Sequence, residues 1–463
     1  MKLNNKEMEI FIMKIKINNI GHVDKAEIDV DSITVIAGNN NTGKSTVGKV
    51  LYATATGLNL LDECKVLTEK GEVIADKIDT FSRIIELEDE EEAFLEKIKD
   101  YCQYAEFLEE FSDQSCKEID QLFSNKVTKD ISKVVNQIIN RVSSNKKSIV
   151  NMVKKDLLVY LNKSINDKNY KINIMQKVFD DVFLKQITSL FDTEKESFIS
   201  VKELNQNEIK LGFCNQQLVF ENTDLELDRP FAKAIYIDNP FILDSPPRRI
   251  FIKKKSYSYR DLLKAFIFNR RNLTSSNLFE LDIREKQIEE IFRYVMKEGR
   301  ISFKEGLNYI MNDEVQTPLF IQNLSTGLKS FSIMELLLRS DILSKLEYLI
   351  LDEPEIHLHP EWQLKYAELI VLISKHFNIK VIITSHSPYF IEAIELFSKK
   401  HMYSADVKFY RTIGSKENQG YYTIEDVSLN VKKLYKDLAS AFYELENLRV
   451  ELKFGGVEGS ENR

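Results

Sequence analysis

The sequence has few cysteines, and none of them forms the closely spaced pairs typical of zinc or redox centres. The four cysteines in 463 residues are Cys64, Cys102, Cys116 and Cys214, with no C-x-x-C pair. Scattered single cysteines are typical of proteins in a reducing compartment, where disulfides are rare. The spacing therefore predicts reduced thiols and gives no zinc site.

The sequence also lacks a long apolar run. No stretch approaches the roughly 18 uncharged apolar residues that a membrane helix needs, and the charged start, with Lys2, Lys6 and Glu7, lacks a signal-peptide pattern. We therefore expect a cytoplasmic protein with no membrane association. The apolar content of 43% is enough to bury a core, and the net charge of -8 argues against a uniformly basic coat for nucleic acid.

Proline is absent between residues 59 and 195, and Gly71 is the one glycine there. This segment has long helical periodicity, which predicts an inserted helical arm. Acidic residues dominate from Glu86 to Asp113, and basic residues dominate from Lys126 to Lys171. Antiparallel helices of opposite charge could pair along their flanks, and we favour this structural interpretation over a ligand site.

A phosphate-binding motif follows the first predicted strands. Residues 13–37 alternate as strands and end in the apolar run from Ile33 to Ala37. The next eight residues match G-x-x-x-x-G-K-[ST] and lead into a helix-compatible segment, which is the context that this motif requires. The predicted nucleotide-binding residues are Gly38, Asn39, Asn40, Asn41, Thr42, Gly43, Lys44, Ser45 and Thr46.

Each part of this motif has a chemical role. The glycines let backbone N–H groups point at phosphate oxygens, and the helix N-terminus adds its positive end. Lys44 supplies a full charge to the β and γ phosphates of ATP, and the Ser45 hydroxyl is a ligand for Mg²⁺. The motif therefore predicts an ATP and Mg²⁺ site.

Two adjacent carboxylates end a second apolar strand, Leu346 to Leu351. Asp352 can hold Mg²⁺ through its water shell, while Glu353 can act as the general base that activates water. Acidic residues at strand ends are common in surface loops, so the pairing with the phosphate-binding motif carries this interpretation. Together the two motifs predict ATP hydrolysis.

A histidine follows a third apolar strand, Ile379 to Thr384. His386 is placed where an imidazole could contact the γ-phosphate or the attacking water. Such a histidine is usually unremarkable, but the order of two acids, a helix and then a strand with the histidine favours a catalytic role.

A second small-residue segment opens a later helix. Leu324 to Ser330 reads Leu-Ser-Thr-Gly-Leu-Lys-Ser, and Ser325 could simply be an N-cap. A helix N-terminus with small residues is also a phosphate-binding surface. We therefore take Ser325, Gly327 and Lys329 as further candidate nucleotide contacts.

These four elements, in this order, resemble the ABC-type ATPase heads of the SMC, RecF and OLD (overcoming lysogenization defect) group. In that group the Leu-Ser-x-Gly signature of one subunit closes over the nucleotide of another. The resemblance implies that Ser325 and Gly327 act in trans, so that two heads form a homodimer or higher homo-oligomer around ATP.

Two longer motifs look like those of the OLD-like ATPases of bacterial anti-phage systems such as Septu and PARIS. They are Asp352 to Pro360, which reads D-E-P-E-I-H-L-H-P, and Ser385 to Phe390, which reads S-H-S-P-Y-F. The resemblance covers residues 13–60 and about 320–400, and the family's Q-loop glutamine has no assigned position here. His357 and His359 could form a zinc pair, but no third ligand is near and we favour a structural role.

The resemblance also indicates what the chain lacks. Full-length OLD nucleases carry a TOPRIM domain, with a glutamate and a D-x-D pair, after the histidine. Nothing after Ile391 supplies a convincing D-x-D. We therefore expect an ATPase without a nuclease of its own, and a separate effector protein, a nuclease or toxin, as its partner.

A local basic stripe runs from Arg248 to Arg271, with nine Lys and Arg residues against one acid, Asp261, and with aromatic residues interleaved. Such a stripe could bind the phosphate backbone of DNA. A solvated helix face or a protein-binding surface explains it equally well, so both interpretations stay open.

The predicted fold class is α/β, an ABC-type P-loop ATPase head with an inserted, coiled-coil-like helical arm. The expected divisions are 1–58 (head, with the P-loop), 59–195 (helical insertion), 196–320 (second lobe), 321–424 (head, with signature, acids and histidine) and 425–463 (terminal helix and disordered tail). The preferred function is the ATPase of an anti-phage defence complex. The alternatives are a RecF-like or SMC-like DNA-repair ATPase and a scaffold that holds ATP but barely hydrolyses it.

Overall fold

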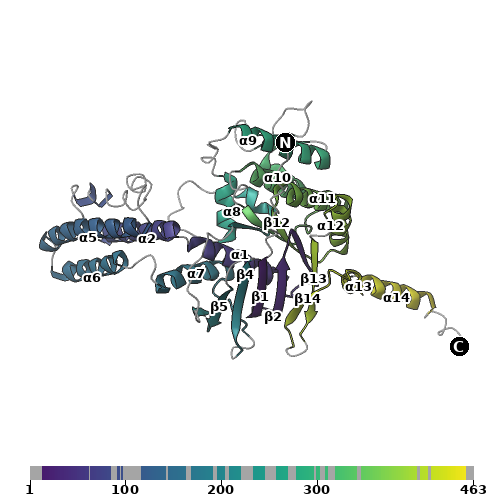
Figure 1. Cartoon of the computed structure of the whole chain (residues 1–463), viewed down its shortest axis with the longest axis horizontal. Helices are drawn as coiled ribbons and strands as arrows, with labels where there is room; N and C mark the ends of the chain where they lie inside the picture. The colour runs from purple at the N-terminus through teal and green to yellow at the C-terminus, as the bar shows by residue number, and fades with distance from the viewer. Residues whose placement is uncertain are drawn as a thin grey trace, which may run out of the picture. The chain divides into compact units, whose positions relative to one another are not determined.

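The protein is described by a computed structural model (Figure 1). It describes residues 13–61, 63–84, 91–93, 95–96, 116–141, 144–162, 168–190, 195–203, 208–219, 233–245, 257–268, 278–296, 299–302, 308–310, 319–340, 346–403, 407–415, 419–438 and 440–454. No helix in these ranges is long and apolar enough to cross a membrane.

The chain divides into two compact units. The first comprises Met1–Thr56, Lys177–Asp224 and Ala232–Arg463, and the second comprises Gly57–Gln176 and Leu225–Phe231. The second unit therefore interrupts the first in the sequence.

The first unit contains an 11-stranded sheet with the order β6-β5-β4-β1-β2-β14-β13-β3-β12-β11-β7. Antiparallel pairing joins β6, β5, β4, β1 and β2, and parallel pairing joins β13, β3, β12, β11 and β7. The strands are β1 (Met13–Ile20), β2 (Val23–Val30), β3 (Ile33–Ala37), β4 (Ser197–Glu203), β5 (Ile209–Cys214), β6 (Gln217–Val219), β7 (Lys233–Ile237), β11 (Leu346–Asp352), β12 (Lys380–Ser385), β13 (Val407–Gly414) and β14 (Tyr422–Asp426).

The parallel strands are apolar because both of their faces are covered. All five residues of β3 are buried, as expected for a strand between two layers of helix. On one face, Gly48 of α1 (Lys44–Leu60) lies so close that an added Cβ would be 3.0 Å from Tyr236 and 3.1 Å from Ile350. The other face packs into the main hydrophobic core.

Helices α8 to α12 supply that core (Figure 1). They are α8 (Tyr259–Phe268), α9 (Leu278–Met296), α10 (Thr326–Arg339), α11 (Pro360–Phe377) and α12 (Pro388–Lys400), with the short helices η1 (Pro240–Asp244) and η3 (Ile321–Asn323) beside them. A three-stranded sheet is formed by β8 (Arg300–Ser302), β9 (Asn308–Ile310) and β10 (Leu319–Phe320).

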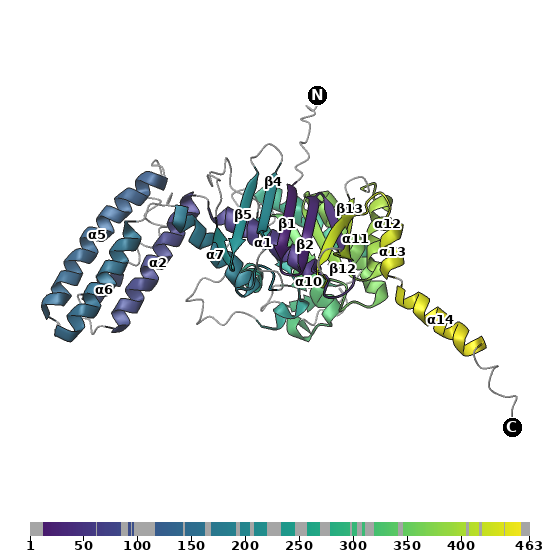
Figure 2. The same cartoon turned by 90° about the horizontal axis from the view of Figure 1, so that it is seen from below.

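The second unit is helical, as its composition predicts. Helices α2 (Glu63–Ile84), α5 (Cys116–Arg141) and α6 (Ser144–Leu161) pack side by side (Figure 2), and α7 (Lys168–Phe183) follows them in sequence. Buried apolar residues on their inner faces include Ile78, Val134 and Leu157.

Ion pairs link segments of this unit that are far apart in sequence. The Arg141 guanidinium lies 2.5 Å from the Glu91 carboxylate, and Lys77 Nζ lies 3.2 Å from Asp156. Most of the acidic segment Glu86 to Asp113 lies outside the described residues.

The α/β fold class with an inserted helical unit is confirmed. The sequence also predicted one terminal helix within residues 425–463, and this prediction was wrong in detail. The structure has two helices, α13 (Lys432–Leu438) and α14 (Ser440–Phe454), after β14 ends at Asp426.

Candidate functional site

The candidate site lies where four parallel strands end. The carboxyl ends of β3, β12, β11 and β7 share one edge of the sheet, so the residues that follow them are brought together. These residues are Gly38, His386, Glu353 and Asp238. Three of the four predicted motifs, far apart in sequence, therefore meet at one edge.

The loop after β3 has the backbone geometry of a phosphate cradle. Gly43 has a φ of +83°, a conformation that residues with a Cβ rarely adopt, and Asn41 is also left-handed at +62°. A Cβ on Gly38 would lie 1.8 Å from the Thr412 hydroxyl oxygen, so glycine is required there. Thr42 Oγ1 closes the loop by donating to the carbonyl of Asn39 at 2.8 Å.

Lys44 is buried inside this loop. Its Nζ donates to the carbonyl oxygens of Gly38 at 3.0 Å and Asn39 at 2.6 Å, and it lies 3.4 Å from Oε1 of Glu353. Burial lowers the pKa of Lys44, although the nearby carboxylates oppose this shift. The ammonium lies inside the loop on two of its carbonyl oxygens, which places its positive charge next to any phosphate bound there.

Asp352 is surrounded by three hydroxyl groups. Its Oδ1 accepts from Ser45 at 2.9 Å and from Thr384, and its Oδ2 accepts from Tyr236 at 2.7 Å. Burial raises the pKa of Tyr236 well above its usual value, so its hydroxyl remains a donor. The Ser45 contact joins the phosphate-binding loop directly to the acid 307 residues later.

Glu353 adopts a strained backbone. Its φ is +47°, and for a residue with a Cβ this left-handed conformation costs about 1 kcal/mol. Its N–H donates to the carbonyl of Thr384 at 3.0 Å and lies 3.1 Å from that residue's hydroxyl oxygen. Strain that neighbouring contacts maintain is typical of functional sites.

His386 lies beside two carboxylates. Its Nδ1 is 3.5 Å from Oε1 of Glu353 and 3.8 Å from Oε1 of Glu355. The structure therefore brings together Lys44, Asp352, Glu353 and His386, as the sequence motifs predicted.

The signature segment occupies a different position in the fold. Ser325 is the N-cap of α10 and its side chain accepts from the N–H of Leu328 at 3.4 Å. An added Cβ on Gly327 would lie 3.4 Å from Leu358 and 3.6 Å from Trp362. Within one chain, then, the signature packs against Leu358 in the loop before α11 and against Trp362 in the first turn of α11.

Lys329 is buried and pairs with an acid of its own chain. Its Nζ lies 2.6 Å from Oδ1 of Asp244 and 5.7 Å from the centre of the Phe241 ring. The same Phe241 ring packs edge-on against His357, at 5.2 Å between centroids. These contacts connect α10 to η1 and to the loop that follows Asp352 and Glu353.

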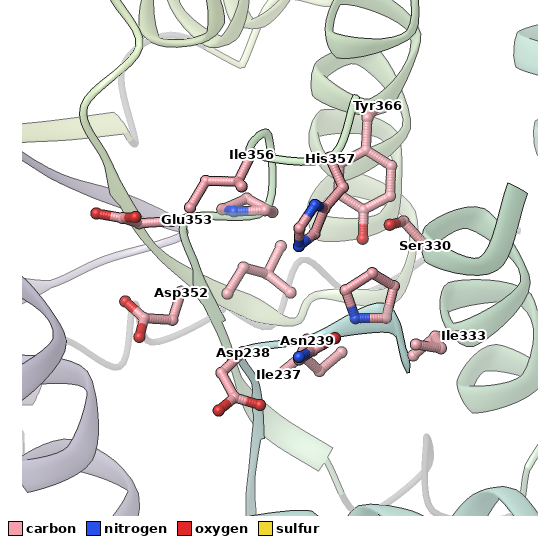
Figure 3. Close-up of a pocket in the computed structure, with 13 residues that line it drawn as sticks. Ile237, Asp238, Asn239, Ser330, Ile333, Asp352, Glu353, Ile356, His357 and Tyr366 are labelled. Carbon is pink, nitrogen blue, oxygen red and sulfur yellow. The ribbon is translucent and has the colours of Figure 1, made fainter. Parts of the chain in front are cut away.

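A small cavity lies between α10 and the acids Asp352 and Glu353. About 40 Å³ in volume, it has Ser330, Ile333, Tyr366 and His357 around it, and its wall also includes Asp352. In Figure 3 the Asp352 carboxylate lies on the side away from Ser330 and Ile333. This volume is enough for about three water molecules, which is too little for a nucleotide.

A larger hollow of about 230 Å³ lies beside the start of α1. Its lining includes Gly21, His22, Thr46, Lys49 and Gln186. Of the predicted nucleotide-binding residues, Thr46 lines this hollow.

The residues that could hold Mg²⁺ are few. In the described ranges no group of three or more His, Cys, Asp or Glu side chains could hold a metal ion. The Ser45 hydroxyl and the Asp352 carboxylate are two hard oxygen donors at one point, which suits Mg²⁺ because this ion keeps waters and phosphate oxygens in its shell.

Sequence analysis missed Tyr236 and Glu355 as site residues. Tyr236 lies in an apolar strand 116 residues before Asp352, and its hydroxyl next to the strand end was the available signal. Glu355 lies within the D-E-P-E motif, which by itself gives this residue no role, yet it is 2% exposed and accepts from Ser385 Oγ at 2.5 Å.

The basic stripe is described in part. Of its charged residues, Arg260 donates to Asp238 at 2.5 Å, at the end of β7. The described part of the stripe is Tyr257–Phe268, and Lys253, Lys254 and Lys255 lie outside the described residues.

The fold and this site together define a P-loop ATPase. The family described as "AAA ATPase domain" matches residues 10–391, and the chain belongs to this family. No curated protein matches the chain.

Solved structures similar to this chain are SMC head domains. The head from Thermotoga maritima is 10% identical, with 90% of this chain and 98% of that chain covered and a TM-score of 0.38. The head with a coiled coil and joint from Pyrococcus yayanosii is 11% identical, with 93% and 99% covered and a TM-score of 0.36.

Proposed function

We propose that the chain is the ATP-hydrolysing subunit of a bacterial anti-phage defence complex, in which two heads dimerise around ATP and control a separate nuclease or toxin. The hydrogen bond between Ser45 and Asp352 is the observation that supports the ATPase part. It joins the phosphate-binding loop to the acid that an Mg²⁺–ATP site requires.

Nucleotide binding would rearrange the charges around Lys44. In the structure its ammonium is balanced by Glu353 at 3.4 Å. Phosphate oxygens bound in the loop would replace Glu353 as the ion-pair partner of the Lys44 ammonium. The Glu353 carboxylate would then be free to contact water. Binding of ATP would thereby prepare the base for the attacking water.

Asp352 and Ser45 are the residues that would hold Mg²⁺. The ion, when bound, neutralises phosphate charge and orients the β and γ phosphates. Tyr236 and Thr384 donate to Asp352 and fix the direction of its carboxylate.

Glu353 is the proposed general base. It accepts a proton from water as the water oxygen attacks the γ-phosphorus, and the bond to the β-phosphate oxygen breaks to give ADP and phosphate. His386, 3.5 Å from the same carboxylate, would contact the γ-phosphate or the attacking water.

The signature segment would complete the site of a second copy. Ser325 and Gly327 lie at the N-terminus of α10, a 14-residue helix whose N–H groups can bind phosphate. A homodimer with two shared nucleotides would use both signatures. Lys329 in this arrangement would act through its pair with Asp244 or exchange Asp244 for phosphate.

Two variants test the ATPase proposal. Lys44→Ala should lose ATP binding, whereas Glu353→Gln should keep binding and lose turnover by about 100-fold or more. Turnover and binding of a fluorescent ATP analogue measure the two effects separately. Equal, slow hydrolysis by the wild type and Glu353→Gln would instead favour a scaffold that holds ATP.

The defence role is supported by the resemblance of residues 352–360 and 385–390 to the OLD-like ATPases. Tagged Glu353→Gln protein, purified from its own host with ATP, should retain a stoichiometric nuclease or toxin. Recombination proteins in its place would favour the RecF-like repair alternative.

DNA binding through Arg248–Arg271 is a separate part of the proposal. The pairing of Arg260 with Asp238 places one basic residue of the stripe near the strand edge of the site. Charge reversal at Lys253, Lys254 and Lys255 should abolish salt-sensitive DNA binding. DNA binding that survives this change would show that the stripe is not the DNA-binding surface.

A further inference from the structure

Glu355 is a buried carboxyl group that none of the proposed chemical steps uses. It is 2% exposed, and burial raises its pKa. Its Oε1 accepts from Ser385 Oγ at 2.5 Å and from the N–H of His386 at 3.2 Å. One carboxylate oxygen thus holds two consecutive residues at the end of β12.

The segment that Glu355 holds is itself ordered by further polar contacts. The N–H of Ser387 donates to Ser385 Oγ at 3.1 Å, and Ser387 Oγ donates to Gln363 at 3.2 Å. Gln363 in turn donates to the carbonyl of Leu358 at 3.1 Å. The loop after the acids and the loop carrying His386 are therefore tied together on both sides of Glu355.

Two buried atoms in this network have no hydrogen-bond partner. They are Oε2 of Glu355 and Nδ1 of His386. The nearest carboxylate oxygens to Nδ1 are 3.5 Å away on Glu353 and 3.8 Å away on Glu355, both beyond a normal hydrogen bond. Unsatisfied buried groups are rare and costly, and here they adjoin the proposed base.

We propose that Glu355 is a positioning residue for hydrolysis, which holds the Ser385–His386 backbone so that the imidazole faces the Glu353 carboxylate. This inference rests on the proposed ATPase function. Glu355 touches neither the substrate nor the metal in this assignment, because its contacts are to Ser385 and His386.

We call the two contacts of Glu355, to Ser385 and His386, the Glu355 clamp. Removing this clamp should lower turnover without weakening ATP binding. Glu355→Ala should reduce kcat about 10-fold to 100-fold and leave KM for ATP within about 2-fold, since misplacement of a catalytic group acts on the chemical step. Glu355→Gln keeps an oxygen acceptor for both donors and should retain kcat within about 3-fold. Glu392→Ala, an exposed glutamate on α12, is the matched control.

A double variant shows whether Glu355 acts through His386. Glu355→Ala combined with His386→Ala should have the kcat of His386→Ala alone, because the second change removes the group that the first misplaces. Multiplied losses in the double variant would overturn the inference, as would a Glu355→Ala protein with wild-type kcat. A Glu355→Gln protein as slow as Glu355→Ala would overturn it too.

Two measurements keep the inference testable if Glu355→Ala does not fold. Ser385→Ala removes one of the two donors to Glu355 and should lower kcat about 3-fold to 10-fold at unchanged KM; unchanged kcat would count against the clamp. Hydrogen exchange of the 385–390 peptide should be faster in Ser385→Ala and unchanged in Glu355→Gln. If the wild-type chain hydrolyses no ATP, the proposed function fails first, whereas a normal wild-type rate with no effect of these variants rejects the clamp alone.

Discussion

The phenolic hydroxyl of Tyr236 donates a 2.7 Å hydrogen bond to Oδ2 of Asp352. The two residues come from neighbouring parallel strands, β7 and β11, in which Tyr236 pairs with Ile350. Tyr236 is 1% exposed, so no water competes for the hydroxyl. This contact leaves Asp352 with a fixed carboxylate plane before any metal binds.

Tyr236→Phe should lower the affinity of the site for Mg²⁺. Loss of a partner that orients a metal-binding carboxylate typically costs about 10-fold in metal affinity, so the Mg²⁺ concentration for half-maximal ATPase activity should rise by about 10-fold. The measurement is an ATPase titration with Mg²⁺ at saturating ATP. Tyr435→Phe is the control, because its hydroxyl donates to Glu395 away from the site. An unchanged Mg²⁺ dependence would show that Tyr236 does not orient Asp352.

Ser45 could be predicted as a site residue from the sequence, whereas Tyr236 could not. The sequence predicted that Ser45 and Asp352 share a metal, because each lies in a motif after an apolar strand, and the structure places them 2.9 Å apart. Tyr236 carries no motif, and its role depends on which strand pairs with β11. Strand order in a sheet is set by packing of the whole unit, which no local pattern in residues 233–237 specifies.

For Glu355, the sequence showed the motif but not the burial of the side chain. Its place in the D-E-P-E motif was visible in the sequence, but glutamate at that spacing is equally compatible with an exposed side chain. Its burial follows from the contacts of Ser385 and His386, which arrive from β12. Local secondary structure was thus predictable, whereas the contacts between elements required the fold.

Two inactive variants should restore activity when mixed. Lys44→Ala disables the phosphate loop of one copy, and Ser325→Arg disables the signature of the other. A mixed dimer has one site with both an intact loop and an intact signature, so activity should return to about a quarter of wild type if subunits exchange freely. Steady-state ATPase assays of each variant and of their equimolar mixture give the measurement. No recovery after co-expression would argue that the signature does not act in trans.

Lys329→Met should destabilise the head by about 2 kcal/mol, because it removes a buried ammonium whose partner, Asp244, is partly exposed and would lose its ion pair. Denaturant unfolding followed by tryptophan fluorescence measures the loss. Asp244→Asn in the same chain should recover part of it, since the remaining charge is removed. Lys436→Met, an exposed lysine on α13, is the control. A loss equal to that of the control would mean that the pair contributes nothing.

Glu355→Gln should change the pH dependence of stability. Burial raises the pKa of Glu355 above its usual 4.5. Such a carboxyl contributes stability that is fully present below the unfolded pKa and is lost as pH rises through the folded pKa. The variant lacks this loss, so it should melt at a higher temperature than wild type near pH 8, and the difference should vanish toward pH 4.5. A pH-independent difference, or none, would mean that Glu355 is not a strained buried acid.

Strand β3 is synthesised long before the two strands that pair with it. Its neighbours in the sheet are β12 and β13, where Ile33 pairs with Val381 and Val407. The strand that ends in the phosphate-binding loop is translated early, yet both of its partners leave the ribosome hundreds of residues later. The nascent chain must carry this apolar segment unpaired while the helical unit is made, so a chaperone that binds short apolar strands is expected to engage residues 33–37 during translation.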